Sequence, residues 1–254
     1  MPRVIHRPPF IIHHYASLGS TNDQLKQMSD APEFTCVVAD AQTAGRGRRA
    51  RHWLSVPGDG LYFSVLLRPT WPASQIPLLS LMSAIAVTET VARYGVAKLD
   101  IKWPNDVLAG ERKLSGILVE GVSVGTDAPR IIVGIGVNLN HQSFPPDLSE
   151  TATSLFLECG RRIERSEFRD TLLAALMKWY ERARYESASL IIQRWQQLSS
   201  YARGKQVVVT LDDEQISGET AGLTETGALL LRTHAGELRT IIAGEVSRLR
   251  SCEL

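Results

Sequence analysis

Four arginines lie within seven residues in the segment Gly45-Arg46-Gly47-Arg48-Arg49-Ala50-Arg51, which is interleaved with glycine and lacks apolar periodicity. We expect a loop here. Arginine presents planar, bidentate donors that suit carboxylate and phosphate groups, and glycine lets backbone amides approach an anion. Gln42 and Trp53 flank the segment and add an amide and an aromatic surface. We interpret it as a loop that closes over a small anionic ligand; a solvated basic loop or a weak nucleic-acid contact is the alternative.

A second polar group follows a short apolar stretch, at Lys102-Trp103-Pro104-Asn105-Asp106. Proline cannot continue a strand ladder, and Asn-Asp favours a turn. The segment is therefore either a simple strand-ending turn or a place where polar atoms project into a cleft and a carboxylate orients an amine or a metal ion. Lys113 opens the next apolar strand, either as an edge gatekeeper or with its ammonium in the same cleft. Gly116 within that strand marks a bulge or the close approach of a ligand.

The third motif is Gly134-Ile135-Gly136-Val137-Asn138, in which the glycines and Asn138 share one face of a strand. That face forms a bare trough on which a flat ligand could lie, or one that a neighbouring helix covers. The sequence has no third glycine of a dinucleotide fingerprint, no Gly-Lys-Ser/Thr phosphate loop, no nucleophile elbow and no metal-spaced Cys/His cluster. Carboxylate or phosphate chemistry must therefore use the loop arginines and a lysine.

The elements that must position these motifs follow from periodicity and turn residues. Ser20 caps a helix over residues 21–28, with Asp23 as its acidic capping-box partner. Further helices are predicted at 77–93, 166–185 and 189–198. Strands are predicted at 10–15, 34–39, 61–67, 98–103, 113–122 and 130–140, and then, after a boundary near 201–204, at 206–211, 215–223, 228–232 and 237–242. The pattern predicts an α+β domain followed by a small all-β, barrel-like domain.

Composition narrows the possible classes of protein. The 254 residues hold 28 Lys and Arg against 27 Asp and Glu, a net charge of +1 that argues against a dedicated nucleic-acid binder. Three scattered cysteines, Cys36, Cys159 and Cys252, fit a reduced compartment better than a disulfide scaffold. No apolar run approaches the roughly 18 residues of a membrane helix, and no signal peptide is present. We expect a cytoplasmic protein.

Taken together, these motifs resemble the biotin–protein ligases. The resemblance rests on Ser20-Thr21-Asn22, Gln42 with the arginine loop and Trp53, Lys102 to Asp106, Lys113-Leu114-Ser115-Gly116, and Gly134 to Asn138. It implies a class II synthetase-like catalytic domain with a mixed sheet and helices at residues 1–202, followed by a small SH3-like barrel at 203–254. The implied reaction forms biotinyl-5′-AMP from biotin and Mg-ATP. Biotin is then transferred to a lysine of the biotin carboxyl carrier protein of a biotin-dependent carboxylase, by default acetyl-CoA carboxylase.

The resemblance also implies a role for each matching residue. Lys113 and Arg48 are the implied catalytic cations, and Asp106 would orient the acceptor amine or accept its proton. The residues implied to bind biotin or biotinyl-5′-AMP are Ser20, Thr21, Asn22, Gln42, Gly45, Arg46, Gly47, Arg48, Lys113, Gly116, Gly134 and Gly136. The residues implied on the ATP or adenine side are Arg49, Arg51, Trp53, Asn105 and Asn138. No metal-binding residues are implied, because magnesium arrives with ATP.

The sequence departs from the family in one position and one region. Ala50 stands where many members have glycine, and only 19 residues precede Ser20, too few for the winged helix of members that act as repressors. We therefore expect a ligase that does not bind DNA or membranes, as a monomer or a homodimer. Two competing functions are a lipoate–protein ligase or acyltransferase on the same fold, and a nucleic-acid or regulatory binding module that uses the arginine loop.

Overall fold

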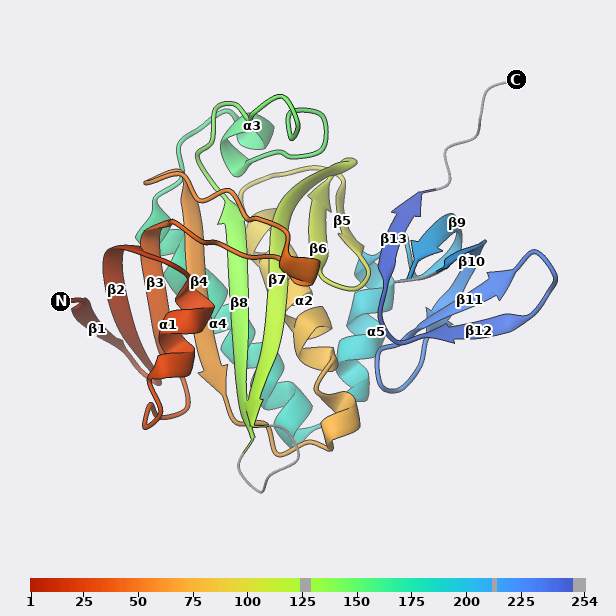
Figure 1. The fold of residues 1–254 in the computed structure, drawn as a ribbon, viewed down its shortest axis with the longest axis horizontal. Coiled ribbons are helices and arrows are strands. Elements are labelled where there is room, and N and C mark those ends of the chain that lie inside the picture. The colour runs from red at the N-terminus through yellow and green to blue at the C-terminus, as the bar shows by residue number, and fades with distance from the viewer. Residues whose placement is uncertain (124–128, 212–213, 249–254) are drawn as a thin grey trace.

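The computed structural model describes residues 1–123, 129–211 and 214–248, which form a large mixed sheet with helices and a smaller antiparallel sheet (Figure 1). In spatial order, the eight strands of the larger sheet are β1 (Arg3–Arg7), β2 (Phe10–Leu18), β3 (Thr35–Gln42), β4 (Gly60–Leu67), β8 (Arg130–Asn138), β7 (Arg112–Ser123), β6 (Asp106–Ala109) and β5 (Leu99–Lys102). β2 and β3 pair in parallel, and the other neighbours pair antiparallel. The sheet is therefore mixed, as the family resemblance implied.

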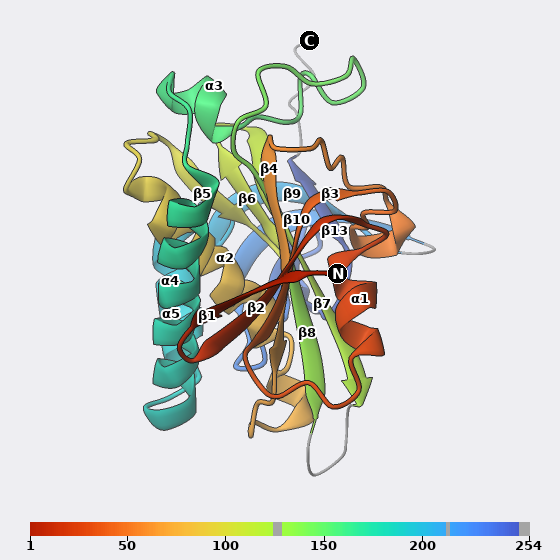
Figure 2. The same cartoon turned by 90° about the vertical axis from the view of Figure 1, so that its left-hand side faces the viewer.

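Helices cover the two faces of this sheet unequally. The helices are α1 (Thr21–Gln27), α2 (Leu78–Ala92), α3 (Leu155–Cys159), α4 (Arg165–Tyr185) and α5 (Ser189–Leu198), with 3₁₀ turns η1 (Arg48–Ala50) and η2 (Ala73–Gln75). In Figure 2, α2, α4 and α5 pack on one face and α1 on the other. β4 is buried along its whole length because helices cover both of its faces. The apolar core lies between the sheet and α2, α4 and α5.

The smaller sheet follows α5 and contains the C-terminal strands. Its spatial order is β12 (Leu238–Ile241), β11 (Leu229–Thr233), β10 (Gln215–Leu223), β9 (Arg203–Thr210) and β13 (Glu245–Arg248). The Trp103 indole donates to the Gly227 carbonyl at 3.0 Å, which joins this domain to the turn after β5. The antiparallel arrangement agrees with the SH3-like class that the family resemblance implied. The exact domain bounds, 1–202 and 203–254, stay a prediction.

The structure adds four elements to those predicted from the sequence. β1 is an edge strand with mostly exposed side chains, so it lacks the apolar alternation that marks a half-buried strand. β6 begins at Asp106, inside the segment interpreted as a turn, and α3 and β13 are only five and four residues long. Cys36 is buried and reduced; Cys252 lies outside the described residues.

One apolar segment corrects the expectation that no run is long enough to cross a membrane. Residues Ala73–Ala92 meet the length and hydropathy of a membrane span, and 67% of that window is buried. Here the segment contains α2, which packs between the sheet and helices α4 and α5. Its apolar character is that of a core helix, since nearly every residue of α2 is buried.

Candidate active site

The predicted site residues gather on the face of the large sheet that carries α1. In Figure 1 the chain between β3 and β4, which contains η1, crosses in front of β8 and β7. We call residues 45–51 of this connection the arginine loop. Three parts of the sequence therefore meet here: the start of α1, the arginine loop, and strands β7 and β8 with the Asn105-Asp106 turn.

The start of α1 forms one polar wall of the site. Ser20 caps the helix, its hydroxyl accepting from the Asp23 amide at 3.4 Å, as the sequence predicted. The Gln42 side-chain oxygen accepts from the Thr21 backbone amide at 2.8 Å and lies 3.1 Å from the Thr21 hydroxyl. The Gln42 amino group donates to Ser55 at 3.1 Å. Thr21 and Gln42, separated in sequence, are thus fixed against each other.

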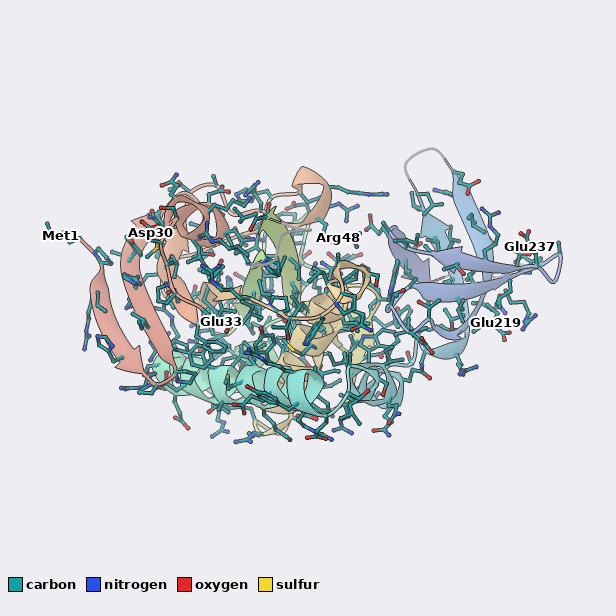
Figure 3. The ribbon with its side chains drawn as sticks, turned by 90° about the horizontal axis from the view of Figure 1, so that it is seen from below. Met1, Asp30, Glu33, Arg48, Glu219 and Glu237 are labelled. Atoms are coloured by element: carbon teal, nitrogen blue, oxygen red, sulfur yellow. The ribbon has the colours of Figure 1, made fainter. Side chains whose placement is uncertain are left out.

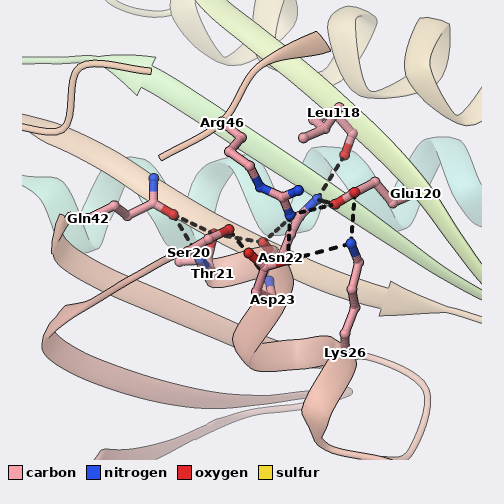
Figure 4. Close-up of polar contacts among 10 residues, drawn as sticks. Ser20, Thr21, Asn22, Asp23, Lys26, Gln42, Arg46, Leu118 and Glu120 are labelled. Atoms are coloured by element: carbon pink, nitrogen blue, oxygen red, sulfur yellow. Dashed lines mark hydrogen bonds and ion pairs between the residues drawn. The ribbon is translucent and has the colours of Figure 1, made fainter. Parts of the chain in front are cut away.

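Arg46 is held by acidic groups that the sequence did not assign to the site (Figure 4). Its guanidinium pairs with the Asp23 carboxylate and lies 3.7 Å from Glu120. Glu120 also accepts from Lys26 at 2.7 Å. Burial alone would raise the pKa of Glu120, but hydrogen bonds from Lys26 and Asn22 and the charges of Lys26 and Arg46 outweigh it and lower the pKa below its usual value. The carboxylate therefore stays ionised.

Protein side chains lie on the face of β8 that carries Gly134 and Gly136, for which the sequence left a ligand or a covering helix as alternatives. A Cβ atom at Gly134 would lie 2.3 Å from the Asn22 oxygen, and one at Gly136 would lie 2.5 Å from the Trp53 ring. The glycines are needed because these two side chains rest directly on the strand. A flat ligand on this face must therefore lie against Asn22 and Trp53 or displace them. Asn22 belongs to α1, so over Gly134 the structure favours the alternative in which a helix covers this face.

Lys113 and Asp106 form the charged centre of the site. The Lys113 ammonium lies 2.6 Å from one oxygen of Asp106, and Lys102 lies 3.5 Å from the other. The Lys113 ammonium is also 5.4 Å from the centre of the Trp53 ring. A Cβ atom at Gly116 would lie 2.9 Å from that ring and 3.1 Å from the Lys113 side chain. The structure thus places the Lys113 ammonium against Asp106, one of the two positions that the sequence left open.

The remaining predicted residues occupy less central positions. The Asn105 amide donates to the Ile117 carbonyl at 2.8 Å, and the Asn138 amide donates to the Thr153 carbonyl at 3.0 Å. Both amides therefore brace the backbone around Lys113. Gly45 lies close to the Trp53 carbonyl and to Ser55, where a Cβ atom would be only 2.7 Å and 2.9 Å away. Arg49 has a positive φ of 54° within η1.

The arginine loop is fastened to the smaller domain. Arg48 donates to the Gly244 carbonyl at 3.1 Å, and Arg51 makes a forked pair with the Glu245 carboxylate, one arm of which is 2.6 Å. Figure 3 places Arg48 on the side of the large sheet that faces the smaller domain. Burial lowers the pKa of Arg48, an effect to which the neighbouring Arg49 charge adds. Two of the four loop arginines thus have partners 196 and 194 residues further along the chain, a link that no local pattern reveals.

Removing the Glu245 charge should loosen the arginine loop. For Glu245→Gln we expect the initial rate of tryptic cleavage within residues 45–51 to rise about fivefold, the factor that corresponds to losing roughly 1 kcal/mol from an exposed pair. Glu214→Gln is the matched control, because Glu214 pairs with Arg239 at 3.3 Å in the same domain. Equal cleavage rates in the two variants would show that Glu245 does not hold the loop.

Several residues of the site were not among the predicted ones: Asp23 as a partner of Arg46, then Lys26, Ser64, Glu120 and Glu245. Ser64 was a usable signal, since it is the one polar residue in the apolar run of β4 and is completely buried. Among the described residues, no group of three or more His, Cys, Asp or Glu side chains is placed to hold a metal ion.

Comparisons with known proteins agree with this geometry. Residues 16–138 match the biotin/lipoate A/B protein ligase family, and residues 203–249 match the biotin protein ligase C-terminal domain. The chain is 34% identical over 238 residues to the Paracoccus denitrificans biotin–[acetyl-CoA-carboxylase] ligase, covering 91% of this chain and 98% of that one. It is 38% identical over 213 residues to the bifunctional ligase/repressor BirA of Bacillus spizizenii, covering 82% of this chain and 64% of that protein's length.

Solved structures show the same fold. The biotin protein ligase from Aquifex aeolicus in complex with biotin and ATP matches with a TM-score of 0.80 and 33% identity, covering 94% of this chain and 99% of that chain. The match extends over both domains, and the sequence motifs, the site geometry and the two domain models all point the same way. The chain therefore belongs to the biotin protein ligases of the biotin/lipoate A/B protein ligase family.

Proposed function

We propose that the chain joins biotin to a carrier protein in two steps at this site. In the first step, a biotin carboxylate oxygen attacks the α-phosphorus of ATP, forming biotinyl-5′-AMP and releasing pyrophosphate. In the second, the ε-amine of a carrier lysine attacks the acyl carbon, forming an amide, releasing AMP and losing a proton. Magnesium enters with ATP as part of the nucleotide substrate.

The observation that carries this proposal is the Lys113–Asp106 pair, 2.6 Å apart, on the face of the sheet where Thr21 and Gln42 are hydrogen-bonded to each other. A cation is needed where a carboxylate meets a phosphate, because two anions at about 4 Å repel by roughly 4 kcal/mol at an effective dielectric near 20. A carboxylate beside it suits the second step, in which an amine must be oriented and deprotonated. Thr21 and Gln42 supply hydrogen-bonding groups for the ureido ring of biotin.

Similar proteins support the choice of substrates. The Aquifex aeolicus structure contains biotin and ATP, and the Paracoccus denitrificans relative is named for acetyl-CoA carboxylase. We therefore assign the biotin carboxyl carrier protein of acetyl-CoA carboxylase as the acceptor. Lipoate is the competing acid on this fold, but its dithiolane ring has no N–H groups and would leave the Gln42 oxygen without a ligand donor.

The direct test measures pyrophosphate release from ATP in parallel with biotin, lipoate and octanoate. We expect release only with biotin, and a biotinylated carrier domain by mass spectrometry when the carrier is added. Release with lipoate alone would keep the fold and reassign the substrate. No release with any acid would overturn the proposal and reopen a binding role for the arginine loop.

A further inference from the structure

A chain of hydrogen-bonding side chains with a buried middle runs from Glu120 to Gln42. Its inner members are Asn22, Ser64 and Thr21, all almost completely buried. The Ser64 hydroxyl lies 2.5 Å from the Asn22 oxygen and 2.7 Å from the Thr21 hydroxyl. The Thr21 hydroxyl in turn lies 3.1 Å from the Gln42 oxygen. Such a chain has a direction, because each hydroxyl has only one proton to donate.

Both amides at the ends of this chain have fixed orientations. One terminal atom of Asn22 lies 2.6 Å from the Glu120 carboxylate and 3.4 Å from the Leu118 carbonyl, both acceptors, so that atom must be the nitrogen (Figure 4). The Asn22 oxygen therefore faces Ser64. The terminal atom of Gln42 that meets the Thr21 backbone N–H must likewise be the oxygen. The chain of hydroxyls therefore ends at two amide oxygens, those of Asn22 and Gln42, which accept hydrogen bonds and have no proton to donate.

Proton counting then gives the chain its direction. Two hydroxyl protons serve three oxygen–oxygen contacts, and two close oxygens repel when no proton lies between them. In the shortest contact, 2.5 Å, the Ser64 hydroxyl donates its proton to the Asn22 oxygen. The Thr21 proton then lies in the 2.7 Å contact between the Thr21 and Ser64 hydroxyls. The longest contact, 3.1 Å between the Thr21 hydroxyl and the Gln42 oxygen, is left without a proton. Thr21 and Gln42 thus both present lone pairs.

We propose that Ser64 and Glu120 are positioning residues that make Thr21 and Gln42 a pair of hydrogen-bond acceptors facing the ligand. Glu120 orients the Asn22 amide, the Asn22 oxygen accepts a hydrogen bond from the Ser64 hydroxyl, and the Ser64 hydroxyl accepts one from the Thr21 hydroxyl. The matching ligand group has two neighbouring N–H donors, as a cyclic urea does. This inference rests on the proposed function and deepens it, because it explains how the site selects a ureido ring.

The test uses two ring analogues of biotin and direct binding by calorimetry, with ATP absent. In each cyclic carbamate analogue, an oxygen replaces one of the two ring N–H groups. The unmodified chain should bind biotin at least about 100-fold more tightly than either analogue. The ring oxygen of an analogue is an acceptor, and it would face the acceptor oxygen of Thr21 or Gln42 with no proton between them. In Ser64→Ala the Thr21 proton is released and can be donated to the ligand. Discrimination against one of the two analogues should then fall at least about tenfold.

Two further variants separate this role from a structural one. Ser83→Ala is the matched control, because Ser83 is equally buried but donates to Leu79 in its own helix at 2.7 Å; its discrimination should stay at the unmodified level. Ser64→Cys keeps a weak donor and acceptor and should retain part of the discrimination, which also covers the case in which the alanine variant does not fold.

The outcomes are distinguishable. If Ser64→Ala binds biotin and discriminates against the analogues as strongly as the unmodified chain does, the positioning role is overturned and the proposed function stands. If the alanine variant is unfolded, the same result in a folded Ser64→Cys variant has the same meaning. No biotin binding by the unmodified chain would overturn the proposed function, and this assignment with it. A Ser64→Ala variant that loses affinity for biotin and both analogues by the same factor would also contradict the assignment, since a collapsed pocket does not discriminate.

Discussion

Lys113→Ala is expected to lower biotin-dependent pyrophosphate release by about 100- to 1,000-fold, the usual cost of removing a group that stabilises developing charge. Lys113 is placed for this role by its strand, by its contact with Asp106 and by Gly116, whose missing side chain leaves room for the Lys113 side chain beside the Trp53 ring. Its ammonium would offset the repulsion between the biotin carboxylate and the α-phosphate and then stabilise the charge that develops at phosphorus. Pyrophosphate release at saturating biotin and ATP measures the effect.

Lys102→Ala is the matched control for this prediction. Lys102 faces the other oxygen of the same carboxylate, 3.5 Å away, so its removal changes the local charge by the same amount. We expect a much smaller loss of rate than in Lys113→Ala. Calorimetric titration with biotin should show that the Lys113 variant still binds the acid, which separates binding from chemistry. Near-normal pyrophosphate release in Lys113→Ala would exclude the assigned role.

The fold could be predicted where one local signal was strong. β10 was predicted with its observed bounds, and β7, β8 and the long helices were predicted to within a few residues, because their apolar residues are buried in a regular pattern. β6 was missed because Asn105-Asp106 is favourable in turns and the strand that follows has four residues. Its position is decided by pairing with β5 and β7, which is a tertiary interaction.

The site was predictable as a list of residue types but not as a network. The sequence singled out Lys113, Asp106, Gln42 and the arginine loop by residue type and spacing, but the local pattern left an edge lysine, a plain turn or a solvated loop as alternatives. The family resemblance supplied their roles. The sequence could not assign Glu120, since a glutamate at the end of an apolar strand is ordinary until Arg46 and Lys26 are brought to it by the fold. The same holds for Glu245, which meets the arginine loop only through domain docking.

Asp106→Asn should separate the two half-reactions. The Asp106 side chain is 13% exposed and lies between two lysines, and under the proposed function it orients the incoming amine or accepts its proton. Removing a proton acceptor of this kind costs about 100- to 10,000-fold, so we expect transfer from biotinyl-5′-AMP to the carrier to slow by that factor. Adenylation should fall only about tenfold, the cost of one charge-assisted hydrogen bond to Lys113.

The pH dependence of transfer shows whether Asp106 accepts the proton or only orients the amine. A free lysine has a pKa near 10.4, so its neutral fraction rises about tenfold per pH unit between pH 6 and 9. If Asp106 accepts the proton, the asparagine variant should follow that slope while the unmodified enzyme rises less steeply. Parallel slopes would leave orientation as its role. The control is Asp100→Asn, because Asp100 is a partly buried carboxylate that accepts from the Ser200 backbone amide at 2.8 Å. Transfer from preformed biotinyl-5′-AMP that is as fast in Asp106→Asn as in this control would remove Asp106 from the second step.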